Sequence, residues 1–225
     1  MKVGDNYYND KLNAEKLFKV YDTKIMRIKQ YLKAEIDYVR SSINADKTVI
    51  ELGAGYGRII KELAPFCKSV IGIDISENNV MLAKEYLKNL PNADVIKMNV
   101  HSIELKSTFD IVLCLQNGIS SMGITPEDIK NIMNLLNFGG HAFFSTYSSK
   151  FWDCRLEWFE EQAAKGLLGE IDTENTGDGV IVCKDGFRAT TRSPEEFEKL
   201  GRMTGYPLKI VEVDNSSLFL VISKE

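Results

Sequence analysis

The residues most suited to chemistry lie in segment 49–58, which reads Val-Ile-Glu-Leu-Gly-Ala-Gly-Tyr-Gly-Arg. Three glycines alternate with larger residues between an apolar stretch and a helical pattern, so the backbone can turn sharply and let a ligand approach closely. The carboxylate of Glu51 precedes the turn, where it would repel a pyrophosphate and favour a cationic ligand. The pattern therefore predicts a ligand-binding turn, with a tight turn that holds no ligand as the alternative.

The spacing of the glycines distinguishes between ligand classes. Gly53, Gly55 and Gly57 follow a Gly-x-Gly-x-Gly pattern, and position 58 is arginine. Dinucleotide-binding turns instead have Gly-x-Gly-x-x-Gly, and phosphate-binding loops continue into Gly-Lys-Ser/Thr. A nicotinamide-dependent oxidoreductase and a nucleoside-triphosphate enzyme of that loop type are both disfavoured.

A second carboxylate, Asp74, ends the next apolar stretch, about twenty residues beyond the first glycine. An acid at that position lies beside the first turn in open α/β sheets and can accept hydrogen bonds from both ribose hydroxyls of an adenosine. A helix-capping acid is the alternative. The two turns together predict a nucleoside site.

The elements that must position these residues follow from the apolar periodicity. Apolar residues recur every three or four positions between Ile25 and Val39, which predicts an amphipathic helix that the polar segment 41–47 ends. Short apolar runs and helical patterns then alternate, which indicates right-handed crossovers and a parallel sheet covered on both faces. We expect strands at 48–52, 69–75, 94–100, 109–115 and 141–145, and helices at 58–66, 76–89 and 125–136.

The C-terminal third interrupts this alternation. Segment 151–168 is helical and aromatic, and a hairpin signal follows at 180–190, around Lys-Asp-Gly. A capped helix begins at Ser193, and two strands at 208–213 and 218–222 are joined so shortly that they must be antiparallel neighbours. We expect an N-terminal helical cap at 1–42 and an α/β, Rossmann-like, doubly wound domain at 43–225, with a helix-plus-hairpin lid inserted at 151–190.

The motifs as a set resemble those of class I S-adenosylmethionine-dependent methyltransferases. The resemblance covers Glu51-x-Gly-x-Gly-x-Gly and Asp74 motif by motif, spans residues 48–145 and extends through the closing hairpin. It implies a seven-stranded, mostly parallel sheet with a C-terminal antiparallel hairpin, and S-adenosyl-L-methionine as the cofactor. It also implies a site in which the first turn holds the methionine part and Asp74 the ribose, with cofactor contacts from Glu51, Gly53, Ala54, Gly55, Gly57, Asp74 and Ile75.

The same resemblance implies contacts from outside the first two turns. The family usually places an acid after the third strand to read the adenine amino group, and here Asn99 and Val100 stand there, so an amide would make this contact. Tyr21 and Arg27 resemble the leading segment of small-molecule methyltransferases of the glycine N-methyltransferase type. In that segment an aromatic residue or an arginine touches the cofactor's carboxylate, so Arg27 is expected to act as a charged clamp.

Residues near the transferred methyl are expected after the fourth strand, because ligands of open α/β sheets bind beyond the carboxyl ends of the strands. Gln116 and Asn117 stand there and could orient a small polar acceptor, or be ordinary turn amides, and Gln116 is also expected to contact the cofactor. The Asn/Asp-Pro-Pro-Tyr/Phe sequence of enzymes that methylate nucleobases or glutamine is absent. His101 is the one imidazole suited to act as a base, although a loop histidine without a sequence partner is more often a bystander. An aromatic lid, or part of the core, is formed by Tyr7, Tyr8, Trp152, Trp158 and Phe159.

Composition limits the classes of partner. The 225 residues carry a formal net charge of −4, which removes the bulk attraction that most nucleic-acid binders use. The longest apolar runs fall far short of the ~20 residues of a membrane helix. The N-terminus shows no apolar leader, so a cytoplasmic location is expected. The four cysteines and two histidines lack the spacing of a zinc site, which predicts free thiols and no metal.

The sequence thus predicts methyl transfer from S-adenosylmethionine to a small-molecule acceptor, without a nucleic-acid or membrane partner. Nitrogen, oxygen, sulfur and carbon acceptors are all compatible with it. One alternative is a methyltransferase that acts on RNA or protein. The other is a module that binds the nucleoside and performs no chemistry.

Overall fold

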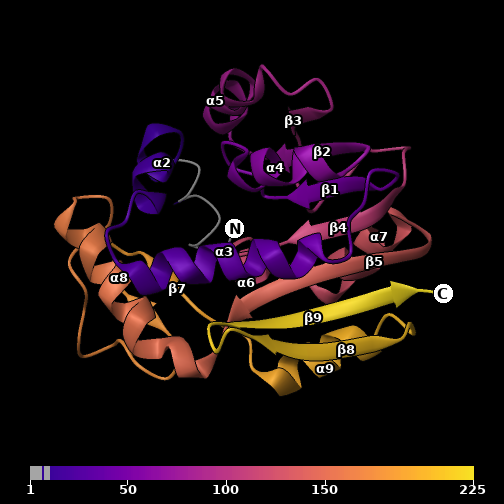
Figure 1. Cartoon of the computed structure of the whole chain (residues 1–225). Coiled ribbons are helices and arrows are strands. Elements are labelled where there is room, and N and C mark those ends of the chain that lie inside the picture. Colours follow the sequence, from indigo (N-terminus) through magenta and orange to yellow (C-terminus); the bar gives the residue numbers. More distant parts are fainter. Residues whose placement is uncertain (1–6, 8–10) are drawn as a thin grey trace.

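The computed structural model describes residue 7 and residues 11–225, and its centre is one seven-stranded sheet (Figure 1). The strands are β1 (Thr48–Leu52), β2 (Ser69–Asp74), β3 (Ala93–Lys97), β4 (Phe109–Cys114), β5 (Leu136–Tyr147), β8 (Leu208–Val213) and β9 (Ser217–Lys224). Their order is β3-β2-β1-β4-β5-β9-β8, and β1 to β5 pair in parallel. The chain reverses its direction of travel across the sheet between β1 and β4, which is where open α/β sheets bind ligands.

The seven-stranded, mostly parallel sheet predicted from the sequence is confirmed, and the structure refines its C-terminal edge. β9 pairs antiparallel with both β5 and β8, with Thr146 opposite Leu218 and Ile210 opposite Leu220. The reversed strand therefore lies inside the sheet, and β8 forms the edge. β5 is also longer than the 141–145 expected.

Helices cover both faces of the sheet, as a doubly wound fold requires. They are α3 (Met26–Arg40), α4 (Arg58–Leu63) with its 3-10 continuation η1 (Ala64–Phe66), α5 (Glu77–Leu87), α6 (Gly118–Ser121), α7 (Pro126–Asn134) and α9 (Pro194–Arg202). The apolar faces of α3, α4 and α5 pack in one buried cluster with one face of the strands, and those of α6, α7 and α9 pack in a second cluster with the other face. Only α6 had no sequence signal.

Side-chain caps explain why three helices begin where the sequence predicted. The Ser76 side chain accepts a hydrogen bond from the Asn79 N–H at the start of α5. Thr125 and Ser193 each form a reciprocal capping box, at the starts of α7 and α9. These bonds satisfy N–H groups that the first turn of a helix leaves without a partner.

A third buried cluster lies beside the sheet, where the N-terminal segment packs against a segment from the C-terminal third of the chain. It contains α2 (Glu15–Tyr21), the first half of α3, η2 (Ser149–Phe151), α8 (Trp152–Ala164) and the hairpin of β6 (Ile181–Val182) and β7 (Arg188–Ala189). The predicted hairpin is present, although each strand has only two residues. In the described part of the chain, none of the helices combines the length and apolarity needed to cross a membrane.

Candidate functional site

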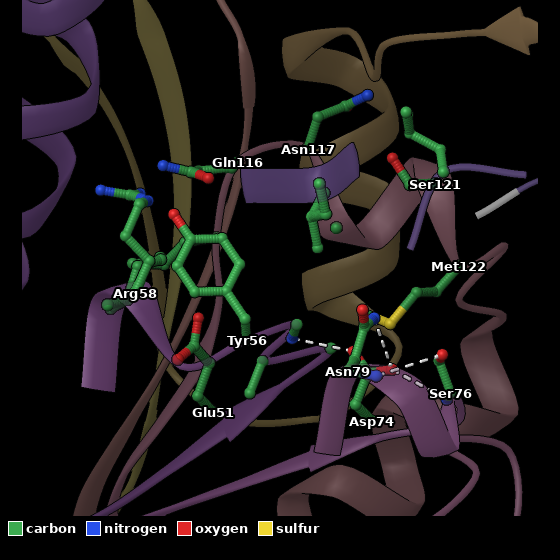
Figure 2. Close-up of a pocket in the computed structure, with 18 of the residues that line it drawn as sticks. Glu51, Tyr56, Arg58, Asp74, Ser76, Asn79, Gln116, Asn117, Ser121 and Met122 are labelled. Carbon is green, nitrogen blue, oxygen red and sulfur yellow. Dashed lines mark hydrogen bonds between the residues drawn. The ribbon is translucent and has the colours of Figure 1, made fainter. Parts of the chain in front are cut away.

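A cavity of about 360 Å3 lies at the carboxyl ends of β1, β2 and β4 (Figure 2). The turns after these strands form one wall, through residues such as Gly53, Asp74 and Gln116. Residues of α2 and α8 form the opposite wall, among them Val20 and Trp158. The switch point of the sheet therefore carries a partly open cavity that lies between the strand-end turns and the helices α2 and α8.

The glycine turn after β1 needs glycine for conformation and for space. Gly53 and Gly55 have positive φ values of 74° and 55°, which L side chains rarely adopt. A Cβ on Gly53 would lie 2.7 Å from Sδ of Met122, and one on Gly55 would lie 2.8 Å from Cδ2 of Leu17. The N–H groups of Gly53 and Ala54 both donate to the carbonyl of Ile73, at 2.9 and 3.0 Å. The turn is thereby held against the end of β2.

Gly57, which was expected to contact the cofactor, differs from the other two glycines of the turn. It does not line the cavity. It precedes α4 with φ 84°, and a Cβ there would lie 2.8 Å from Cδ1 of Leu87 in α5. Gly57 therefore permits close packing of two helices.

Asp74 is nine-tenths buried and already accepts three hydrogen bonds from the chain. Its Oδ2 accepts from the Gly55 N–H at 2.8 Å, and its Oδ1 accepts from the Ser76 N–H at 2.9 Å and the Asn79 amide at 3.1 Å. Burial raises its pKa, and the three hydrogen bonds oppose that rise. A carboxylate has about four acceptor sites, so this one both holds the glycine turn and keeps acceptor capacity towards the cavity.

Three polar side chains that line the cavity, one acidic, one basic and one amide, each have a buried atom without a hydrogen-bond partner among the described residues. Oε2 of Glu51, Nη2 of Arg58 and Nε2 of Gln116 are buried and make no hydrogen bond in the described structure. Figure 2 shows these side chains near Tyr56, on the side of the view opposite Asp74. Burial raises the pKa of Glu51 to about 8, which the Arg58 charge partly offsets. The one sequence signal for Arg58 is its position directly after the last glycine of the turn.

Gln116 and Asn117 form a strained turn after β4. Their φ values of 54° and 62° lie in the left-handed region, which costs free energy for residues other than glycine. Hydrogen bonds hold the turn: the Gln116 N–H donates to Glu35 and Ser145, and the Asn117 amide accepts from Thr146 and donates to the Thr190 carbonyl. The side chain of Asn117 is therefore fully engaged, whereas that of Gln116 faces the cavity.

His101 lines the cavity but has no free ring nitrogen. Its Nδ1 lies 2.9 Å from Oδ2 of Asp128, and its Nε2 lies 3.0 Å from the Met122 carbonyl oxygen. Both partners are hydrogen-bond acceptors, so neither nitrogen is directed at a bound acceptor molecule. The ring holds the turn after β4 to the start of α7.

The residues expected to contact the adenine line the cavity as well. Asn99, Val100 and Ile75 are all part of its lining. The side-chain oxygen of Asn99 accepts from the N–H of His101 at 3.0 Å, which leaves its NH2 group as the available donor. Asn99 therefore offers a donor where the family usually has an acid.

The structure separates the two residues predicted from the leading segment. Tyr21 lines the cavity, and the guanidinium of Arg58 lies 4.8 Å from the centre of its ring. Arg27, which was expected to act as a clamp, does not line the cavity. Its guanidinium donates to the side chain and the carbonyl of Asp214, both at 2.6 Å, and stacks on Phe151.

The predicted aromatic lid is present only in part. Trp158 and Phe159 line the cavity, whereas Trp152 does not. Tyr7 is also outside the lining and donates its hydroxyl to Asp185, and Tyr8 lies outside the described residues. Further lining residues had no sequence pattern that pointed to a ligand, among them Ser121, Met122, Tyr147 and Gln162.

Comparisons with known proteins agree with this geometry. Residues 49–140 match the family model described as "Methyltransferase domain". Over 105 residues the chain is 31% identical to a ubiquinone biosynthesis O-methyltransferase of Nitrosomonas europaea, a match that covers 45% of this chain and 44% of that one. The chain spans less than half the length of the first three curated relatives that it matches.

Two solved structures share the fold over nearly the whole chain. The N-methyltransferase NodS from Bradyrhizobium japonicum WM9, in complex with S-adenosyl-L-homocysteine, has a TM-score of 0.60 at 16% identity, with 99% of each chain covered. DhpI in complex with the same compound has a TM-score of 0.65 at 16% identity, covering 98% of this chain and 94% of that one. At such identities the similarity concerns the fold.

Proposed function

We propose that this chain, which belongs to the class I S-adenosylmethionine-dependent methyltransferases, transfers a methyl group from S-adenosylmethionine to a small-molecule acceptor. One observation carries the proposal. At the switch point of the sheet, Glu51 and Arg58 line the same cavity, and a carboxyl oxygen of the first and a guanidinium nitrogen of the second are buried without hydrogen-bond partners among the described residues. Unpaired groups of this kind are costly unless a ligand satisfies them.

These unpaired groups fit the cofactor's amino-acid end. That end carries an ammonium and a carboxylate, which would be complementary to Glu51 on one side and to Arg58 with Gln116 on the other. Asp74 lies on the opposite side of the view in Figure 2, and its carboxylate can accept further hydrogen bonds from ribose hydroxyls. Asn99, Val100 and Ile75 would border the adenine. The residues present therefore suit an adenosine joined to an amino acid.

The chain's own contribution to catalysis would be alignment and exclusion of water. When bound, S-adenosylmethionine supplies a methyl group on a positively charged sulfur, which is a good leaving group. The strained turn at Gln116 is held by Glu35 and Ser145 and would fix one side of the reacting centre. The side chains of Leu17 and Trp158 would cover it. Holding reactants in line accounts for up to roughly 7–11 kcal/mol of a barrier.

The acceptor's proton has few destinations in the cavity. The described lining contains no lysine, and both nitrogens of His101 are engaged. In the transfer, a lone pair of the acceptor forms the new bond to the methyl carbon, and the carbon–sulfur electron pair stays on sulfur. We assign the released proton to solvent.

A small-molecule acceptor is supported by the walls that surround much of the cavity. The cap at 1–42 and the lid at 151–190 supply its outer wall, through residues such as Leu12, Val20 and Phe159. Net charge −4 also disfavours a nucleic-acid acceptor. The relative from Nitrosomonas europaea is named for a role in making ubiquinone, itself a small molecule.

The experiment measures cofactor binding first and transfer second. Titration calorimetry with S-adenosyl-L-homocysteine should show one site per chain. A labelled methyl group should then pass from S-adenosylmethionine into low-molecular-weight extract and not into total RNA or protein. Absence of binding would refute the proposal. Binding without transfer to any of these pools would favour a nucleoside-binding module.

A matched pair of arginine variants tests the amino-acid end. Arg58→Gln should weaken S-adenosyl-L-homocysteine roughly tenfold or more, because a charge-assisted hydrogen bond is lost. The same variant should bind 5′-methylthioadenosine, which lacks the amino-acid end, as the parent does. Arg27→Gln should leave both affinities unchanged. Equal effects of the two variants would contradict this placement of the amino-acid end.

A further inference from the structure

The cavity wall formed by the cap, the lid and the end of β5 is largely aromatic. We call it the aromatic wall and define it by Tyr21, Tyr147, Trp158, Phe159, Gln162 and Ala189. None of these side chains carries a formal charge, whereas the opposite wall has Glu51, Arg58 and Asp74. A charged molecule placed against the aromatic wall would lose its hydration without gaining an opposite charge there.

Gln162 supplies the one side-chain amide of this wall. It is only 3% exposed, and it lines the cavity from α8. Its backbone carbonyl accepts from the Leu167 N–H, which holds the end of α8 in place. A side-chain amide both donates and accepts hydrogen bonds, so this one is suited to a ligand that does the same.

Two arginine side chains of the protein already lie over rings of the aromatic wall. The guanidinium of Arg155, which is 1% exposed, lies 4.6 Å from the ring centre of Tyr147 and 5.5 Å from that of Phe159. The guanidinium of Arg58 lies 4.8 Å from that of Tyr21. Rings attract cations through the negative charge of their faces. In the cofactor complex the charge of Arg58 would be balanced by the cofactor's carboxylate, so Arg155 is the guanidinium that would repel a cationic acceptor, and an ammonium is disfavoured.

We propose that the acceptor is an aromatic molecule bearing a hydroxyl group, with its ring against Trp158 and Phe159 and the hydroxyl hydrogen-bonded to Gln162. The proposal rests on the proposed function, because it names the acceptor of that reaction. A hydroxyl donates and accepts, as the amide does. Positive charge behind the rings also favours an electron-rich ring and any ionised hydroxyl.

The test uses the full chain saturated with S-adenosyl-L-homocysteine and three probes of similar size. These are 4-ethylphenol, ethylbenzene and benzyltrimethylammonium, and their affinities are measured by ligand-observed NMR titration. The phenol should bind roughly tenfold more tightly than ethylbenzene, as expected for one buried hydrogen bond. The ammonium should bind most weakly of the three.

Variants of one helix identify the contact. Gln162→Leu should remove the roughly tenfold preference for the phenol while leaving S-adenosyl-L-homocysteine affinity unchanged. Gln162→Met provides a second variant of similar size if the leucine protein melts early. The control Glu160→Gln changes an exposed residue of the same helix and should alter none of the affinities.

The outcomes separate this inference from the proposed function. Binding of the ammonium as tight as that of the phenol would overturn it, as would a preference for the phenol that survives both Gln162 variants. If S-adenosyl-L-homocysteine binds and 4-ethylphenol does not, only the acceptor class is wrong. If S-adenosyl-L-homocysteine itself fails to bind, the proposed function fails and this inference fails with it.

Discussion

The wall of the cavity formed by the turns after β1, β2 and β4 carries Glu51, Arg58 and Asp74, whereas the aromatic wall has no formally charged side chain. The two walls also differ in origin. The three charged residues lie within 24 positions of one another, while the aromatic wall joins segments as distant as Tyr21 and Ala189. A compact, charged motif suits a ligand of fixed chemistry. A wall assembled from the cap and the lid can change its acceptor without disturbing that motif.

The largest effect should come from blocking the glycine turn. Gly55→Val should weaken S-adenosyl-L-homocysteine binding roughly hundredfold or more, because a branched residue resists φ 55° and its Cβ would meet Leu17. Gly139→Val is the control, since Gly139 also has positive φ but open space around its Cβ. It should cost about 1–3 kcal/mol of stability and leave affinity unchanged by calorimetry. Unchanged affinity in a folded Gly55→Val protein would remove the turn from the site.

Asp74 tests whether one carboxylate serves both the ligand and the fold. Asp74→Ala should weaken S-adenosyl-L-homocysteine roughly hundredfold. It should also lower the melting temperature, because the Gly55 and Ser76 N–H groups lose their acceptor. Asp74→Asn should weaken binding less but also melt earlier, since its NH2 group must face one of these donors.

The control for this prediction is an acid on the same side of the sheet. Glu77→Gln, at the exposed start of α5, should change neither affinity nor melting temperature by much, because its ion pair with Lys97 is exposed. A pattern in which Asp74→Asn and Asp74→Ala reduce melting temperature but not affinity would mean that Asp74 serves only to support the turn.

Glu51 gives the charged wall a pH dependence that the aromatic wall lacks. Burial raises its pKa from 4.5 to about 8, so the folded state holds this proton more tightly than the unfolded chain does. Its contribution to stability is present at low pH and is lost as pH rises through about 8. The melting temperature should therefore fall more steeply with pH in the parent than in Glu51→Gln. The window to measure is roughly pH 5.5 to 8.5, because Glu51 of the folded parent titrates within it.

A proton count gives the same prediction a second readout. A bound ammonium favours the ionised carboxylate, so cofactor binding near neutral pH should release up to about one proton from Glu51. Calorimetry in buffers of different ionisation enthalpy measures this release, which Glu51→Gln should abolish. Glu35, whose pKa burial raises to about 7, titrates in both proteins and cancels in the comparison. Equal proton release by the two proteins would contradict the pairing.

The smallest effect on affinity should come from Gly57. Because it faces Leu87 and not the cavity, Gly57→Ala should reduce stability by about 1–3 kcal/mol. Affinity for S-adenosyl-L-homocysteine should stay within about threefold, a change of under 1 kcal/mol. Combining it with Leu87→Val should recover part of the melting temperature by making space. A large loss of affinity in Gly57→Ala would instead place Gly57 in the cofactor site.

Much of the fold and of the charged wall could be predicted from the sequence because the interactions that form them are local. The Thr125 capping box joins residues three positions apart, and the periodicity of 25–39 indicates the buried face of α3. Glu51, Gly53 and Asp74 were located because each stands at the end of an apolar strand, where parallel strands meet at one edge. Such features depend on backbone conformation within a few residues.

The remaining features depend on contacts between distant segments. Arg27 looked suited to a ligand, but the tertiary structure pairs it with Asp214, 187 positions away. Gln162 follows two glutamates in the sequence and resembles part of an exposed face, yet it is buried against the cavity. Periodicity shows which side of an element is apolar and not what it packs against. The sequence alone therefore determined the strands, the caps and the glycine turn, whereas only the order of strands and the packing of cap on lid decided which side chains face the cavity.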